Sequence, residues 1–346
     1  MSQHATGATL RQERAVAGWR RPSPEPVVAA AVFLALALLP AVTEGYVVYI
    51  LPQYLMFGVL ALSLGLLWGR VGILSFGQAA FFAIGAYVMG LVMQSDPGFN
   101  PVYLAVLAAT AAGCAVAAVA GYFLFSAGVR ATYFVLVTLA LSIIAEQVAV
   151  SQSQITGGWN GMYVNRPELP LGPFGTLNLY GDLAIYYVVL PLAAAAYAAV
   201  LWLMTARFGK ILAGVRENED RMIALGFRVS LFKTAAFALS GAVAGFAGAL
   251  YALHSSFVSP SLGGVLFSTE VVVWVAIGGR LSLLGALVGG VLVASLSNYL
   301  SAVAPDTWQL VLGVIFILVI MFFKRGLAGA LQDAVRAAGK LRGGGG

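Results

Sequence analysis

Side chains that could carry chemistry are scarce within the apolar stretches of this sequence. The acidic residues there are Glu146 and Glu270, and each lies near the end of its stretch. A proton-driven pump needs relays of carboxylate or histidine side chains inside the membrane, which two peripheral glutamates do not form. The sequence also lacks the Gly-x-x-x-x-Gly-Lys-Ser/Thr loop that binds ATP phosphates. We therefore expect no catalytic residues and no cofactor.

Cysteine and histidine give no indication of a metal site. Cys114 is the single cysteine and lies in an Ala/Gly-rich apolar run, where we interpret it as a packing residue. His4 lies in a polar tail, and His254 stands alone at the end of an apolar stretch. Neither histidine has the spacing of a metal ligand, so we expect no bound metal.

The composition is that of a membrane protein. Of 346 residues, 61% are hydrophobic and 9% are charged, whereas soluble domains carry about 25% charged residues. A membrane helix needs about 20 mostly apolar residues. The chain is therefore predicted to be an all-α, polytopic integral membrane protein with about ten transmembrane helices. The predicted spans are 27–43, 48–67, 72–94, 101–125, 131–150, 183–205, 233–254, 266–278, 282–300 and 308–323.

The basic residues fix the orientation of these spans. If the N-terminus is cytoplasmic, all of the 19 lysines and arginines except Arg166 fall on the cytoplasmic side, as cytoplasmic loops usually require. Both termini are then cytoplasmic. The net charge of +6 lies in short loops beside apolar spans, which favours contacts with anionic membrane lipid or an acidic partner over nucleic acid.

This topology divides the chain into a cytoplasmic tail (1–26), a membrane domain (27–325) and a second cytoplasmic tail (326–346). The long outside loop, 151–182, is rich in glycine and proline. Glycines permit unusual backbone angles and prolines stiffen the chain, so we expect a rigid cap. The long inside loop is 206–232.

Three sequence features suggest special structure in or between the spans. Glycines stud the spans 72–94 and 233–254, which indicates either close helix packing or helices broken beside a cavity. Gln78 lies in an apolar run and needs a polar partner or water. The stretches 69–74 and 279–284 both read Gly-Arg-x-x-x-Leu, which is either a trace of an internal repeat or chance.

The inside loop has the richest chemistry. Glu217 and Arg221 form an i,i+4 pair in the favourable orientation, and Gly226 is well placed to end a helix. We expect either a short charged helix offered to a soluble partner or a solvated loop.

Several stretches resemble the permease subunits of ABC importers for branched-chain amino acids, the LivM-like group. The resemblance covers roughly residues 45 to 330. It departs from the family pattern where Leu281-Ser282 replaces Gly-Thr and where Phe323-Lys324 replaces Leu-Pro. The matching stretches are Gly69–Gly90, Thr156–Gly161, Arg207–Tyr251, Val271–Leu284 and Trp308–Leu327.

The resemblance implies a transport role for two sets of residues. It makes the inside loop a coupling helix docked on an ATPase subunit, formed by Arg216, Glu217, Asp220, Arg221, Ala224 and Gly226. It places the translocation pathway along residues that include Ser75, Gly77, Gln78, Thr156, Gly157, Gly158 and Glu270.

The resemblance also implies partners and a location. The partners are a second, related permease chain, two ABC ATPase subunits and a periplasmic binding protein. The location is the inner membrane of a bacterium. A permease for urea or short amides and an ATP-independent secondary transporter are the alternatives. In none of these is the chain itself an enzyme.

The topology can be tested by labelling single cysteines in intact cells. In a Cys114→Ala background, an Asn165→Cys variant should react with a membrane-impermeant thiol reagent, because residue 165 is predicted to lie outside. A Glu219→Cys variant should react only after the cells are permeabilised. The opposite pattern would show that the predicted orientation is inverted.

Overall fold

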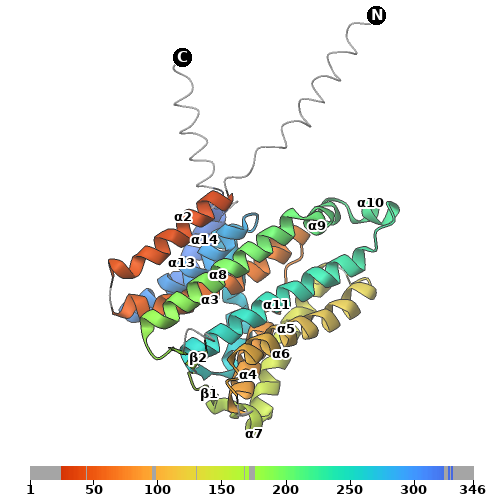
Figure 1. Cartoon of the computed structure of the whole chain (residues 1–346). Coiled ribbons are helices and arrows are strands. Elements are labelled where there is room, and N and C mark those ends of the chain that lie inside the picture. The colour runs from red at the N-terminus through yellow and green to blue at the C-terminus, as the bar shows by residue number, and fades with distance from the viewer. Residues whose placement is uncertain are drawn as a thin grey trace, which may run out of the picture.

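The structure is a computed structural model that describes residues 25–43, 45–95, 99–129, 131–166, 168–170, 176–322, 326–327 and 329. The described chain is a bundle of helices with a few short strands at one end (Figure 1). The principal helices are α2 (Glu25–Leu38), α3 (Tyr46–Gly65), α4 (Gln78–Gln94), α5 (Val102–Ser126), α6 (Ala131–Ser151), α8 (Asp182–Thr205), α9 (Arg207–Glu217), α10 (Glu219–Ala224), α11 (Val229–Ser255), α12 (Val265–Gly278), α13 (Leu283–Val303) and α14 (Trp308–Phe322).

Within the described residues, six helices are long and apolar enough to cross a membrane, which confirms the predicted helical membrane class. Four shorter apolar helices lie near the other predicted spans, so the count of ten remains a prediction. The six are Tyr46–Val71, Val102–Ser126, Thr132–Ser151, Asp182–Thr205, Val229–Ser255 and Leu283–Val303, and the shorter ones are Glu25–Ala41, Gln78–Gln94, Val265–Gly278 and Trp308–Leu318.

Burial separates central helices from peripheral ones. In the most apolar stretch of each helix, 83% of the residues are buried in Tyr46–Val71, which begins with α3, and 72% are buried in α11. The corresponding shares are 28% in α5 and 22% in α6. Large apolar side chains such as Leu107 and Ile144 therefore stay exposed on the peripheral helices. In a bilayer these faces contact lipid tails, which are as apolar as the side chains themselves.

Glycines allow the central helices to approach closely. A Cβ on Gly85 of α4 would lie 2.1 Å from the Gly245 carbonyl oxygen of α11. A Cβ on Gly113 of α5 would lie 2.5 Å from the Gly241 carbonyl oxygen. Helix association in lipid relies on such backbone approach, so close packing is the confirmed interpretation for these glycines.

The predicted span 72–94 is wrong at its start, and here the broken-helix interpretation holds. The helix α3 continues as a π-helix, η3 (Leu66–Val71), and the next helix begins only at Gln78. Gly72 adopts a φ of +84°, in the left-handed region that favours glycine. The segment 72–77 between them is non-helical, so its backbone groups need partners from other elements.

The similar stretches 69–74 and 279–284 do not adopt the same local structure. Gly69 and Arg70 lie within η3, whereas Gly279 has a φ of +112° and follows the end of α12. The two turns nevertheless touch, because a Cβ on Gly69 would lie 2.1 Å from the Arg280 carbonyl oxygen. Nearby, Ser282 accepts a hydrogen bond from the Gly285 amide and caps α13, so the departure from the family pattern there preserves a capping side chain.

The end of the bundle opposite α9 and α10 carries short strands (Figure 1), so the all-α prediction is incomplete. Strand β1 (Met162–Tyr163) pairs antiparallel with β4 (Phe257–Val258), and β2 (Glu168–Pro170) pairs with β3 (Thr176–Asn178). The predicted outside loop 151–182 also contains α7 (Ser153–Thr156) and η4 (Gly158–Asn160). Like η4, two other short segments are 3-10 turns. The turn η2 (Leu39–Ala41) follows α2, and η6 (Pro260–Gly263) follows β4.

The start of α11 and the described residues bear on the predicted inside loop and on the predicted tails. The helix α11 begins at Val229, inside the predicted loop 206–232, and the bounds of this loop at the membrane stay a prediction. Nearly all of the predicted tails 1–26 and 326–346 lies outside the described residues, as do Arg130, Phe323 and Lys324.

The glycine contacts predict a difference between two Gly→Ala variants. Gly85→Ala should lower the Tm of the detergent-purified protein, because overpacking costs about 1–3 kcal/mol. Gly313→Ala on α14 should leave the Tm unchanged or raise it, because nothing lies within 4 Å of a Cβ there and alanine favours helix by about 1 kcal/mol. Equal Tm values for the two variants would contradict the packing.

Candidate functional site

The helix α9 is amphipathic and is anchored to the bundle by one face. Gly209, Leu212 and Val215 are buried, whereas Arg216 and Glu217 at its end are exposed. A Cβ on Gly209 would lie 2.0 Å from the Met204 carbonyl oxygen at the end of α8. The sharp turn between α8 and α9 therefore requires glycine, and it fixes the direction in which α9 leaves the bundle.

The helical conformation is interrupted between α9 and α10 at Asn218, which has an extended backbone (φ −158°, ψ 104°). The Asn218 Oδ1 accepts a hydrogen bond from the Arg221 amide at 2.8 Å, which is an N-cap of the next helix. The predicted i,i+4 pair of Glu217 and Arg221 is therefore wrong, because the two residues lie on different helices. The preference of asparagine for caps is the sequence feature that could have revealed this break.

An ion pair holds α10 against α11. The Lys233 Nζ lies 2.5 Å from the Glu219 Oε2, and the same ammonium lies 5.9 Å from the centre of the Phe125 ring. Glu219 is in the first turn of α10, where a carboxylate also complements the positive end of the helix dipole. Lys233 thus joins α10 to the bundle.

Gly226 ends α10 as predicted. The Gly226 amide donates to the Ile223 carbonyl at 2.9 Å, and the Phe227 amide donates to the Met222 carbonyl at 3.1 Å. With a φ of +86° at Gly226, these two bonds form a Schellman motif. Nothing lies within 4 Å of a Cβ there, so the position is open to a neighbouring molecule.

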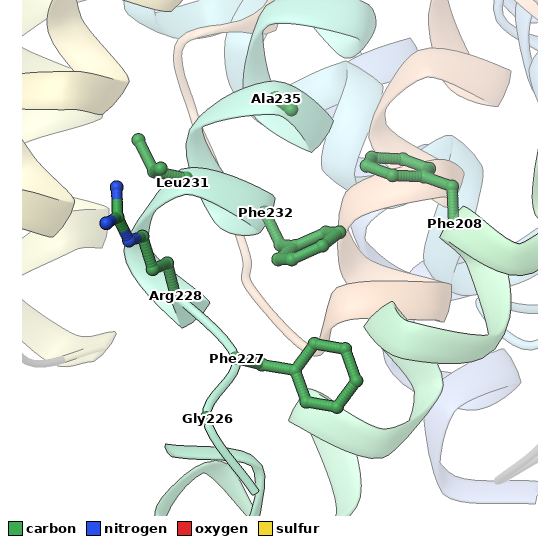
Figure 2. Close-up of a pocket in the computed structure, with 7 residues that line it drawn as sticks. All are labelled: Phe208, Gly226, Phe227, Arg228, Leu231, Phe232 and Ala235. Carbon is green, nitrogen blue, oxygen red and sulfur yellow. The ribbon is translucent and has the colours of Figure 1, made fainter.

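An aromatic hollow of about 360 Å³ lies beside this turn, where α9 approaches the start of α11 (Figure 2). The Phe232 ring lies 6.1 Å from both the Phe208 and Phe227 rings, centre to centre. Figure 2 shows the Arg228 guanidinium pointing away from these rings. The other lining residues are Gly226, Leu231 and Ala235. The charged helix and an apolar hollow therefore share one end of the molecule.

The six predicted coupling residues come together on this end, and all are exposed. Arg216 differs from the others, because its Nη1 donates a hydrogen bond to the Gly69 carbonyl of η3. The remaining charged members have side chains that make no hydrogen bond or ion pair within the described part of the chain. They are Glu217, Asp220 and Arg221, and the small members are Ala224 and Gly226.

A second group of polar residues surrounds Gln78 inside the bundle. The Gln78 Oε1 accepts hydrogen bonds from the Ser63 and Ser240 hydroxyls at 2.9 and 3.2 Å. These residues come from α4, α3 and α11, and all three are almost completely buried. The Gln78 Nε2 has no partner among the described residues. The predicted need of Gln78 for polar partners is confirmed for its oxygen.

Hydroxyls on α6 satisfy both backbone groups of Phe76 in segment 72–77. The Phe76 amide donates to the Thr138 Oγ1 at 3.1 Å, and the Ser142 hydroxyl donates to the Phe76 carbonyl at 2.7 Å. The Ser268 hydroxyl of α12 donates to Ser142 at 2.9 Å, and Ser75 accepts from the Gly77 amide at 3.1 Å. Thr138, Ser142 and Ser268 were not among the residues predicted from the sequence, although isolated hydroxyls in apolar spans often bond across helices.

The remaining predicted pathway residues are dispersed. Thr156 is buried at the end of α7, where its hydroxyl donates to the Ala149 and Gln152 carbonyls. Gly157 and Gly158 follow with φ values of +77° and +59°, a conformation that suits a turn. Glu270 is half-buried on α12, two positions after Ser268. A transport role for this group stays a prediction.

Comparison with known proteins decides the family. Residues 46–320 match the family described as "Branched-chain amino acid transport system / permease component", and this is more than half of the chain. The chain belongs to this family. The LivM-like resemblance is thereby confirmed, and the protein is a multi-pass membrane permease.

Named relatives agree with this family. Over 293 residues, the chain is 29% identical to the "High-affinity branched-chain amino acid transport system permease protein LivM" of Salmonella typhimurium and to that of Escherichia coli, covering 78% of this chain and 67% of each relative. It is also 28% identical to a "Probable branched-chain amino acid transport permease protein LivH" of Methanocaldococcus jannaschii, covering 76% of this chain and 84% of the relative. No solved structure matches the chain.

The capping geometry predicts the behaviour of Asn218 variants. Asn218→Ala should destabilise α10 by about 1 kcal/mol, because the Arg221 amide loses its acceptor. Limited trypsin digestion of the purified permease should then cut faster after Arg221. Asn218→Asp retains the acceptor and should behave as the wild type. Unchanged digestion of the alanine variant would show that this cap does not hold the helix.

Proposed function

We propose that this permease is a membrane subunit of an ATP-driven ABC importer for branched-chain amino acids. Family membership carries the proposal. In this proposal, two membrane chains associate with two ATPase subunits, and a periplasmic binding protein delivers the solute. The cell's inner membrane holds the complex, with both termini of the chain in the cytoplasm.

The end of the bundle that carries α9 and α10 has the properties of a docking surface for an ATPase subunit. Asp220 and Arg221 are exposed on α10, a helix of only six residues, and Glu217 is exposed at the end of α9 just before it. Charges at the edge of an interface guide association and set the register, while an aromatic pocket supplies the apolar contact that binding energy needs. The hollow beside Phe227 is such a pocket.

The polar group around Gln78 suits the translocation pathway of this proposal. Non-helical backbone at membrane depth occurs where it is buried in protein or lines a water-filled cavity. Segment 72–77 and Gln78 place polar backbone inside an apolar bundle, together with an amide nitrogen that has no partner in the part of the chain that the structure describes. Movement of this segment would expose polar groups to a passing solute.

The partner chain of the proposed complex is a related permease. The present chain is similar to proteins named LivM and to one named LivH. Two such chains would place their lipid-exposed faces side by side, and ATP binding would act on both. A ligand can shift a conformational equilibrium only through its different affinity for the two states, so the ATPase subunits must hold α10 differently before and after ATP binding.

Transport by the reconstituted complex tests the proposal. Proteoliposomes that contain the co-purified complex should take up leucine only with ATP and the binding protein present. ATP-independent uptake by this chain alone would identify a secondary transporter, and uptake of urea in place of leucine would identify the other solute class. Arg221→Glu should weaken ATPase association at least about tenfold, as expected for a reversed interface charge. Glu168→Gln, at the opposite end of the bundle, should leave association unchanged.

A further inference from the structure

Arg216 differs from its exposed neighbours because it points back into the protein. Its Nη1 donates a hydrogen bond to the Gly69 carbonyl of η3. Its aliphatic part lies over Gly72, where a Cβ would approach the Arg216 Cγ to 3.1 Å. One side chain therefore contacts both ends of the short turn that links η3 to segment 72–77.

The acceptor of this bond is itself held firmly. A Cβ on Gly69 would lie 2.1 Å from the Arg280 carbonyl oxygen, so the turn after α12 presses directly on η3. The Arg280 guanidinium also lies 5.6 Å from the centre of the Trp68 ring. Because the closely packed backbones leave no free space at this point, Gly69 can move only if the neighbouring turns move too.

The turn leads directly to the polar group inside the bundle. Five residues separate Gly72 from Gln78, and the backbone of one of them, Phe76, is bonded to Thr138 and Ser142 on α6. The Ser142 hydroxyl also accepts a hydrogen bond from Ser268 on α12. A displacement of α9 that pulls on Gly69 therefore reaches segment 72–77 through covalent bonds and then two other helices through hydrogen bonds.

We propose that Arg216 is a positioning residue that transmits movement of α9 to segment 72–77, and that it does not contact the ATPase subunit. The proposal rests on the proposed function, because it assigns the ATPase contact to α10 and the internal link to α9. It gives Arg216 a different role from the other five members of the predicted coupling set, which stays a prediction. A variant that reverses the charges of Arg216 and Arg221 together would affect both the internal link and the ATPase contact. Single variants are therefore needed to separate the two roles.

Two matched variants separate these roles in the co-purified complex. Arg216→Met removes the hydrogen bond but keeps an aliphatic chain over Gly72, and Arg221→Met removes an exposed charge of the same kind. Arg216→Met should retain ATPase association and ATP hydrolysis, while leucine taken up per ATP falls about tenfold, as loss of a hydrogen bond to a charged group would allow. Arg221→Met should lower association, hydrolysis and uptake together.

The conservative variant provides a rescue. Arg216→Lys keeps a cation that can donate to the Gly69 carbonyl, so uptake per ATP should lie between the values for Arg216→Met and the wild type. If Arg216→Met instead loses ATPase association as Arg221→Met does, or if its uptake per ATP equals that of the wild type, the proposed link is wrong.

A second measurement on the permease alone does not depend on the proposed function. A spin label at Ala213→Cys, in a Cys114→Ala background, reports the mobility of the exposed face of α9 in lipid nanodiscs. Arg216→Met should increase this mobility, and Arg221→Met should not. Unchanged mobility with Arg216→Met would overturn the link even if transport is never detected. A wild-type complex that fails to couple ATP to uptake, with the mobility change present, would overturn only the proposed function.

Discussion

The central constraint on this structure is the requirement that buried backbone polar groups find partners. Segment 72–77 leaves the helical conformation inside an apolar bundle, where each unsatisfied amide or carbonyl costs several kcal/mol. Side chains on α6 meet this requirement at Phe76, and the helices around the segment are arranged so that they can. The close glycine contacts of α11 with α4 and α5 then bring the remaining helices near enough to enclose the segment.

Most of the helices were predictable from hydropathy, because a long apolar run has few alternatives in lipid. The span 101–125 was predicted within one residue of α5, and 183–205 within one residue of α8. The start of α4 was not, since Gly72 to Gly77 are as apolar as a helix and hydropathy does not register a break. Gly72 and Gly77 allowed a broken helix, but only tertiary hydrogen bonds show which alternative holds.

Within the candidate site, the sequence identified the region and its helix stop but not the internal contacts. Gly226 was predicted from the preference of glycine for the left-handed conformation, which depends on local backbone geometry alone. The contact of Arg216 with Gly69 joins residues 147 positions apart, so no local pattern could indicate it. The cap at Asn218 was available in principle, and the favourable spacing of Glu217 and Arg221 concealed it.

The helix α11 has a further consequence for how the two ends of the molecule communicate. Its 27 residues form a rod about 40 Å long. One end is tied to α10 by Lys233, and at the other end Arg166 donates hydrogen bonds to the His254 carbonyl and the Ser256 hydroxyl. Its middle rests on α4 and α5 through Gly241, Gly245 and Gly248, with backbones in direct contact. If such a rod tilted about the contacts at its middle, its two ends would move in opposite directions.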